Sequence, residues 1–148
     1  MVKEALRKSN LRIEVIVNLL ALLWIYAAMS KLWDFSKFRK EIYLQVIPPF
    51  VKELVIYGLP PVELIVATGL LFKRYYLPSL YASLALLSAF TIYILLALSG
   101  LLGRAPCSCG GILEKMSWTT HLFFNLTFIA LSAIAIVNFR ERRSGVIR

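Results

Sequence analysis

The chain contains two cysteines, Cys107 and Cys109, in the segment Cys-Ser-Cys-Gly-Gly. A disulfide between residues i and i+2 requires a tight, strained backbone, and strain makes such a bond easier to reduce. The loop that it would close is so short that loop-closure entropy adds little stability. Gly110 and Gly111 supply the backbone freedom that such a turn needs. We therefore interpret the pair as a redox-active dithiol rather than a structural staple.

The main alternative is that Cys107 and Cys109 are two unrelated thiols, buried or facing lipid, without chemistry. A closed structural zinc site takes four ligands, and the single histidine, His121, raises the number available here to three. The spacing also differs from the C-x-x-C-H pattern of haem attachment. We therefore expect no metal site.

His121 follows the cysteines, and Asn125 comes one helical turn later on the same face. An imidazole titrates near neutral pH, so His121 is a candidate to move protons for the thiols or to hydrogen-bond a quinone head group. The alternative is an interfacial imidazole and an Asn125 that only makes a hydrogen bond between helices. The predicted catalytic group is thus Cys107, Cys109 and His121, with His121 and Asn125 as candidate cofactor contacts.

Glu63 is an ionisable residue inside an apolar stretch, just after Pro60-Pro61. Carboxyl groups inside a membrane usually face the bundle interior, where they pair or take part in function. We expect Glu63 to point inward with a hydrogen-bond partner such as Asn18 or Asn125, and we count it as a third candidate cofactor contact. A neutral, purely structural Glu63 is the alternative.

The composition places these residues in a membrane protein. Hydrophobic residues make up 59% of the 148 and charged residues 17%, whereas soluble domains have roughly 45–50% and about 25%. The net charge of +9 comes from basic residues that lie between apolar runs rather than on one polar face. This distribution is typical of topology determinants and not of nucleic-acid binding.

Four apolar runs predict an all-α fold, an integral membrane four-helix bundle. A basic head precedes the first run as in a signal peptide, but the run continues to Leu32 beside interfacial aromatic residues, so we expect an uncleaved helix. Pro60-Pro61 predicts a kink or a fresh helix start within the second span. Residues 34–47 alternate aromatic and charged side chains, which favours a segment at the membrane surface. The predicted spans are about 13–32, 50–72, 77–102 and 120–139.

Four spans put both termini on one side of the membrane. That side, with residues 1–12, the Lys73-Arg74 turn and residues 140–148, carries ten basic residues against seven on the other. The positive-inside rule therefore predicts cytoplasmic tails, an inner-membrane location and a periplasmic loop 103–118 that contains both cysteines.

Several short motifs occur in an order and spacing that resemble one known family. They are Ser30-Lys31-Leu32 with Asp34 and Phe38, Pro61 and Glu63-Leu64 with Gly69-Leu70-Leu71, Cys107-x-Cys109-Gly110-Gly111, and Asn125. From about residue 10 to residue 140 the chain resembles the MauE/DoxX group, and more narrowly the MauE-type redox-associated membrane proteins of methylamine utilisation.

The resemblance implies a DoxX-like four-helix inner-membrane protein that supports the maturation of disulfide-rich periplasmic proteins. It implies Cys107 and Cys109 as the redox pair, and Glu63 and Asn125 as family positions without an assigned role. The expected partners are the lipid bilayer and a periplasmic thioredoxin-like protein or disulfide-containing client, with a quinone as the candidate cofactor. The alternative is a non-catalytic scaffold or small-ligand-binding helical bundle with incidental cysteines.

Overall fold

The computed structural model describes the backbone of residues 2–100 and 117–145 and the side chains of residues 11–100 and 117–141. Every secondary-structure element in these residues is helical, which confirms the all-α prediction. The elements are α1 (Val2–Trp33), α2 (Phe35–Tyr43), α3 (Pro49–Leu71), the 3-10 turn η1 (Lys73–Tyr75), α4 (Tyr76–Leu98) and α5 (Trp118–Gly145).

Four of these helices are long and apolar enough to cross a membrane, as the sequence predicts. The spanning segments are Leu11–Trp33, Pro49–Leu71, Lys73–Leu98 and Trp118–Glu141. The third ends earlier than hydropathy suggests, because Gly100 turns the chain out of the helix with a φ of 78°. A positive φ is easily adopted only by glycine, so the backbone rather than the apolar run determines where α4 ends.

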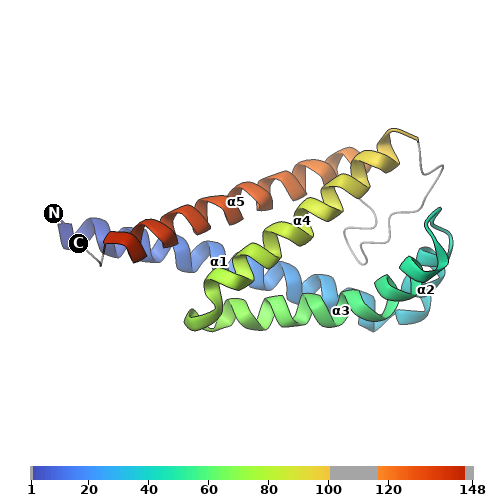
Figure 1. Cartoon of the computed structure of the whole chain (residues 1–148), viewed down its shortest axis with the longest axis horizontal. Helices are drawn as coiled ribbons and strands as arrows, with labels where there is room; N and C mark the ends of the chain where they lie inside the picture. Colours follow the sequence, from blue (N-terminus) through green and yellow to red (C-terminus); the bar gives the residue numbers. More distant parts are fainter. Residues whose placement is uncertain (1, 101–116, 146–148) are drawn as a thin grey trace.

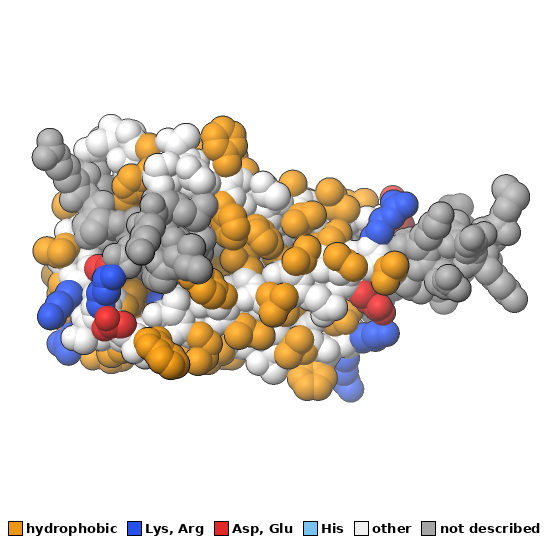
Figure 2. All heavy atoms as spheres, turned by 180° about the vertical axis from the view of Figure 1, so that it is seen from behind, with side chains coloured by type: hydrophobic (Ala, Val, Ile, Leu, Met, Phe, Trp, Pro, Cys, Tyr) orange, Lys and Arg blue, Asp and Glu red, His pale blue; other side chains and the backbone are white. Residues whose placement is uncertain are grey.

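The spanning helices pack as two pairs that close into one bundle. α1 packs mainly against α3 and α4 against α5, and contacts between α3 and α4 and between α1 and α5 join the pairs. The start of α1 and the end of α5 lie at the same end of the molecule, and α2 lies at the other (Figure 1). Apolar side chains cover the middle of the face in Figure 2, and charged side chains gather toward its two ends. This distribution matches a protein with a lipid-facing belt.

The core of the bundle is apolar except for a few buried polar groups. Trp24 is among its largest buried side chains, with Leu20, Leu70 and Leu80 around it. The indole Nε1 of Trp24 donates a hydrogen bond of 2.8 Å to Ser83 Oγ on α4. The indole ring is thus buried with its single hydrogen-bond donor paired, and this bond connects α1 to α4.

α2 is a short amphipathic helix at the end of the bundle opposite the start of α1. Its N-cap is Asp34, whose carboxylate accepts a hydrogen bond from the Lys37 backbone at 3.0 Å. Phe38 and Ile42 are buried against Ile56 of α3, while Arg39 and Lys40 between them are exposed. This one-sided burial fits the predicted surface segment.

α3 continues through the proline pair as one helix, so the prediction of a fresh helix start is wrong. It begins with Pro49, whose missing N–H is not needed in a first turn. Pro60 and Pro61 lie inside it and leave the carbonyls of Ile56 and Tyr57 without their usual helical donors. Packing against α1 and α2 holds the helix together across this point.

Candidate functional site

Glu63 points into the bundle, as predicted, and its side chain is fully buried, with an exposed fraction of 0%. Its partner is Lys31 of α1, at 2.9 Å from Nζ to Oε1. The predicted partners are therefore wrong: Asn18 is exposed, and Asn125 makes no hydrogen bond to Glu63 in the described part of the chain. A carboxylate surrounded by apolar side chains is better compensated by an opposite charge than by an amide.

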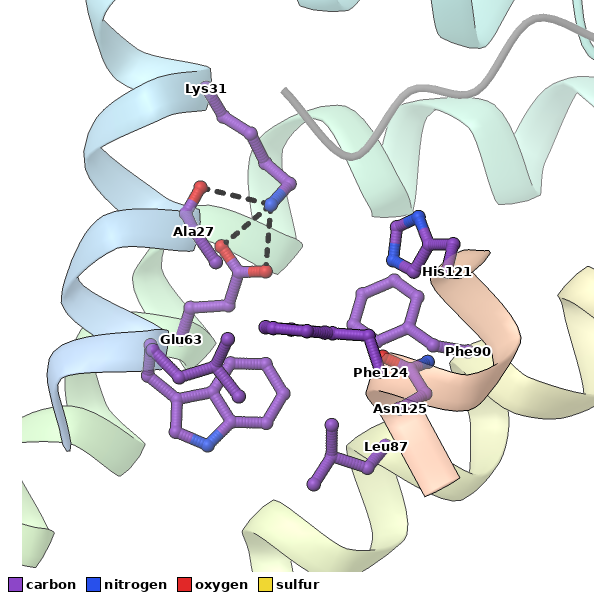
Figure 3. A pocket seen from close by; sticks show the side chains of 10 residues that line it. Ala27, Lys31, Glu63, Leu87, Phe90, His121, Phe124 and Asn125 are labelled. Carbon is purple, nitrogen blue, oxygen red and sulfur yellow. Dashed lines mark hydrogen bonds and ion pairs between the residues drawn. The ribbon is translucent and has the colours of Figure 1, made fainter. Parts of the chain in front are cut away.

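Lys31 is 3% exposed, and all three of its ammonium donors have acceptors. Nζ donates to Glu63 Oε1 at 2.9 Å, to Glu63 Oε2 at 3.2 Å and to the Ala27 carbonyl oxygen at 3.0 Å. Figure 3 shows the lysine side chain turned toward the carboxylate from the last turns of α1. The pair carries no net charge, and this complete hydrogen bonding is what a buried ion pair needs to be tolerated.

A small cavity of about 30 Å³ lies beside this ion pair. It has room for a water molecule, since one water needs roughly 10–15 Å³ of such space. Its polar lining comes from α1, α3 and α5, and Trp24 is one of its apolar walls. Phe90 and Phe124 are two others (Figure 3). The four polar side chains around it are Lys31, Glu63, His121 and Asn125.

His121 faces the cavity from the first turn of α5, with 3% of its surface exposed. Ser117 starts this helix: its Oγ accepts a hydrogen bond from the Thr120 backbone at 3.2 Å, and its carbonyl accepts one from His121 N at 3.0 Å. The imidazole meets the ring of Phe124 edge to face, with 6.5 Å between centroids. The helix start and this aromatic contact together orient the ring.

Asn125 lies one turn further along α5 and is 4% exposed. Among the described residues its Nδ2 has no hydrogen-bond partner. A buried amide donor without an acceptor costs about 1–3 kcal/mol, so such groups usually bind water when the space allows. The adjoining cavity provides that space, and we infer that a water molecule accepts this bond.

Cys107 and Cys109 lie outside the described residues. The described chain stops at Gly100, after the end of α4, and resumes at Ser117, close to His121 in the sequence. Tyr93 connects the end of α4 to its neighbours. Its hydroxyl donates a hydrogen bond to the buried Gln45, and its ring lies against Trp118 of α5, with 6.2 Å between ring centroids. The cysteine segment therefore starts and ends on the part of the bundle that holds the polar cavity.

The structure thus brings together three of the predicted site residues and adds one. Glu63, His121 and Asn125 line the same cavity although they lie on two helices. Lys31 is not among the site residues predicted from the sequence, since it fits a basic topology determinant equally well. The feature of the sequence that could have identified Lys31 is its position before Leu32 and Trp33, still inside the apolar run. A lysine at such a position is able to extend its side chain into the bundle as well as toward the membrane surface.

The space beside the ion pair is small compared with a quinone ring. Its volume of about 30 Å³ is well below that of a cavity that holds benzene, which is about 150 Å³. A quinone contact by His121, Asn125 and Glu63 stays a prediction, and we assign no step to a quinone.

Comparisons with known proteins identify the family. Residues 9–138 match the family model described as methylamine utilisation protein MauE. The methylamine utilization protein MauE of Paracoccus denitrificans is 37% identical over 122 residues, which cover 79% of this chain and 63% of that protein. The match thus spans less than two thirds of that relative's length, and no solved structure matches the chain significantly. Since the family match extends from α1 into α5, the chain belongs to the MauE family of membrane proteins.

Proposed function

We propose that the protein is an inner-membrane thiol–disulfide oxidoreductase that exchanges disulfides with periplasmic proteins through Cys107 and Cys109. One observation carries the proposal: the only two cysteines of the chain belong to the segment between α4 and α5 in the sequence, and the only histidine, in the first turn of α5, lines a buried polar cavity. The relative's name supports methylamine utilisation as the process in which the client takes part.

The reaction is a pair of thiol–disulfide exchanges. A client thiolate attacks the Cys107–Cys109 disulfide and forms a mixed disulfide, and the second client thiolate displaces the bound cysteine. The client gains a disulfide, and Cys107 and Cys109 receive the two electrons as thiols. An oxidised thioredoxin-like partner restores the disulfide by the same exchange in the opposite direction. Protons leave the attacking thiols and return to the departing ones, so the exchange consumes none.

His121 is the candidate to hold and return these protons, because its imidazole lies at the start of the helix that follows the cysteine segment. The Lys31–Glu63 pair has a different role in this proposal. It ties α1 to α3 with no net charge and lines the cavity that α5 closes with His121 and Asn125. The ion pair thus keeps the imidazole beside a polar space in which water is able to carry a proton.

The test uses single variants in cells that produce the client. Cys107→Ser and Cys109→Ser are each expected to abolish client oxidation, and one of them should accumulate a mixed disulfide that runs as a larger, reductant-sensitive species. His121→Ala is expected to slow oxidation several-fold without abolishing it, because water also accepts protons. Ser108→Ala changes the residue between the cysteines and should behave as the unaltered protein.

The non-catalytic alternative gives the opposite result. If the doubly substituted Cys107→Ser/Cys109→Ser protein supports normal client maturation, the cysteines are incidental and the protein is a scaffold or a small-ligand-binding bundle.

A further inference from the structure

A second cavity, of about 570 Å³, opens between α3 and α4 near the turn that joins them. It shares no lining residue with the polar cavity beside Glu63. We propose that this groove binds an anionic phospholipid, with an acyl chain between the helices and the phosphate at Lys73 and Arg74. The proposal is independent of the thiol chemistry.

The groove arises from one close contact between the helices. A Cβ placed on Gly69 would lie 2.1 Å from Ser79 Oγ, so α3 and α4 meet here at a distance that only glycine allows. Away from this contact and the connecting turn, the two helices diverge (Figure 1). Small side chains such as Ala82 line the opening, and Ile65 and Phe72 form apolar walls.

The position of the groove indicates an acyl chain as its occupant. Both helices are spanning segments, and Ile65, with 69% of its surface exposed, and Phe72, with 57%, face the surroundings of the bundle. The hydroxyl of Thr68 is already paired, since it donates to the Leu64 carbonyl of its own helix at 2.7 Å. A groove in a lipid-facing surface with apolar walls is complementary to hydrocarbon.

The charge at one end of the groove indicates an anionic head group. The lining continues through Phe72 and Tyr75, on either side of the two basic residues of the turn. The side chain of Lys73 is 80% exposed, and its contact with Glu14, at 3.2 Å, is a solvent-exposed ion pair of the kind that contributes little. Arg74 is exposed and forms no ion pair with any other described residue. Lys73 and Arg74 adjoin the lining in the chain without being part of it. Basic residues beside a pocket between spanning helices are a recognised means of binding anionic lipid.

The experiment measures the binding of spin-labelled phosphatidylglycerol and phosphatidylcholine to the full chain in phosphatidylcholine nanodiscs. For the unaltered protein we expect an immobilised fraction that is larger for phosphatidylglycerol. Lys73→Ala and Arg74→Ala should each lower the relative affinity for the anionic lipid about fivefold. Ala82→Trp and Thr68→Phe, which fill the groove from either helix, should remove the immobilised component for both lipids. Ala133→Trp, at an exposed position on α5, is the matched control and should change neither.

Three results would overturn the proposal. Equal immobilisation of the two lipids excludes a head-group site, and an immobilised component that survives both groove-filling variants excludes the groove. Cross-linking of two copies through Thr68→Cys in a cysteine-free background would show that a second copy of the chain covers this face instead.

Discussion

At the scale of single residues, the least expected feature is a complete ion pair inside a membrane bundle. Lys31 donates all its hydrogen bonds to Glu63 and Ala27, and both charged side chains are almost fully buried. Such a pair is sensitive to one-sided changes, because a single substitution leaves one charge buried without compensation. Replacing both partners by apolar groups removes the desolvation penalty together with the attraction.

We therefore predict strong coupling between the two positions. Lys31→Met and Glu63→Leu should each lower the free energy of unfolding by about 3–5 kcal/mol, and the double variant should recover most of that loss. The measurement is a double-mutant cycle by thermal unfolding in detergent, and Lys52→Met on the partly exposed start of α3 is the control. Additive effects of the two substitutions would show that the pair does not act as a unit.

Some residues of the site could be predicted from the sequence, but the partner of Glu63 could not. Glu63 was predictable because a carboxyl inside an apolar run has few favourable environments, and His121 and Asn125 were predictable because helical spacing puts them on one face. The partner of Glu63 was not predictable: a lysine near the end of an apolar run fits a topology signal as well as a buried ion pair. Only the packing of α1 on α3 distinguishes the two.

At the scale of elements, hydropathy located the four spans but not the details of their ends or their continuity. α4 stops where Gly100 adopts a positive φ, although the apolar run continues beyond it. α3 passes through two prolines that would end most helices in water. In a membrane no water competes for the backbone, and neighbouring helices hold such a segment in place. Of the two predicted alternatives, a kink or a fresh helix start, the fresh start therefore does not occur.

Gly69 of α3 lies against Ser79 of α4 with no space for a Cβ. Gly69→Ala therefore forces the helices apart or displaces Ser79, and we expect a loss of about 1–3 kcal/mol in the free energy of unfolding. Ser79→Gly in the same protein should restore part of it by removing the clashing atoms. Gly58→Ala is the matched control, since its Cβ would meet only Leu54 at 3.7 Å. Equal stability of Gly69→Ala and Gly58→Ala would contradict the close approach.

At the scale of the whole molecule, the arrangement of the helices determines which groups share a side of the membrane. α1 starts and α5 ends at one end of the bundle (Figure 1). The polar cavity is lined by the last turns of α1 and the first turns of α5, toward the other end. The ten-to-seven distribution of basic residues predicts that the first end faces the cytoplasm. In the proposed orientation the segment between α4 and α5 belongs to the periplasmic side, where disulfides persist.

Reporter fusions test this orientation. Fusions after Arg74 and after Arg148 should be active only with a reporter that works in the cytoplasm, and a fusion after Arg104 only with one that works in the periplasm. The predicted cytoplasmic side has only three more basic residues than the other. Adding two lysines to the segment between α4 and α5 should therefore let a fraction of the molecules insert in the opposite orientation. A periplasmic signal from the Arg148 fusion would contradict the topology and, with it, the redox proposal.

The most direct test of the redox proposal is the thiol state of the two cysteines in intact cells. Rapid acid quenching followed by alkylation with a mass-shifting maleimide counts the free thiols at Cys107 and Cys109. In cells that make the thioredoxin-like partner, we expect most of the protein to carry no free thiol. In cells without the partner, we expect most of it to carry two free thiols. Cysteines that remain reduced in both strains would contradict the redox proposal, because no disulfide would then be available for a client to attack.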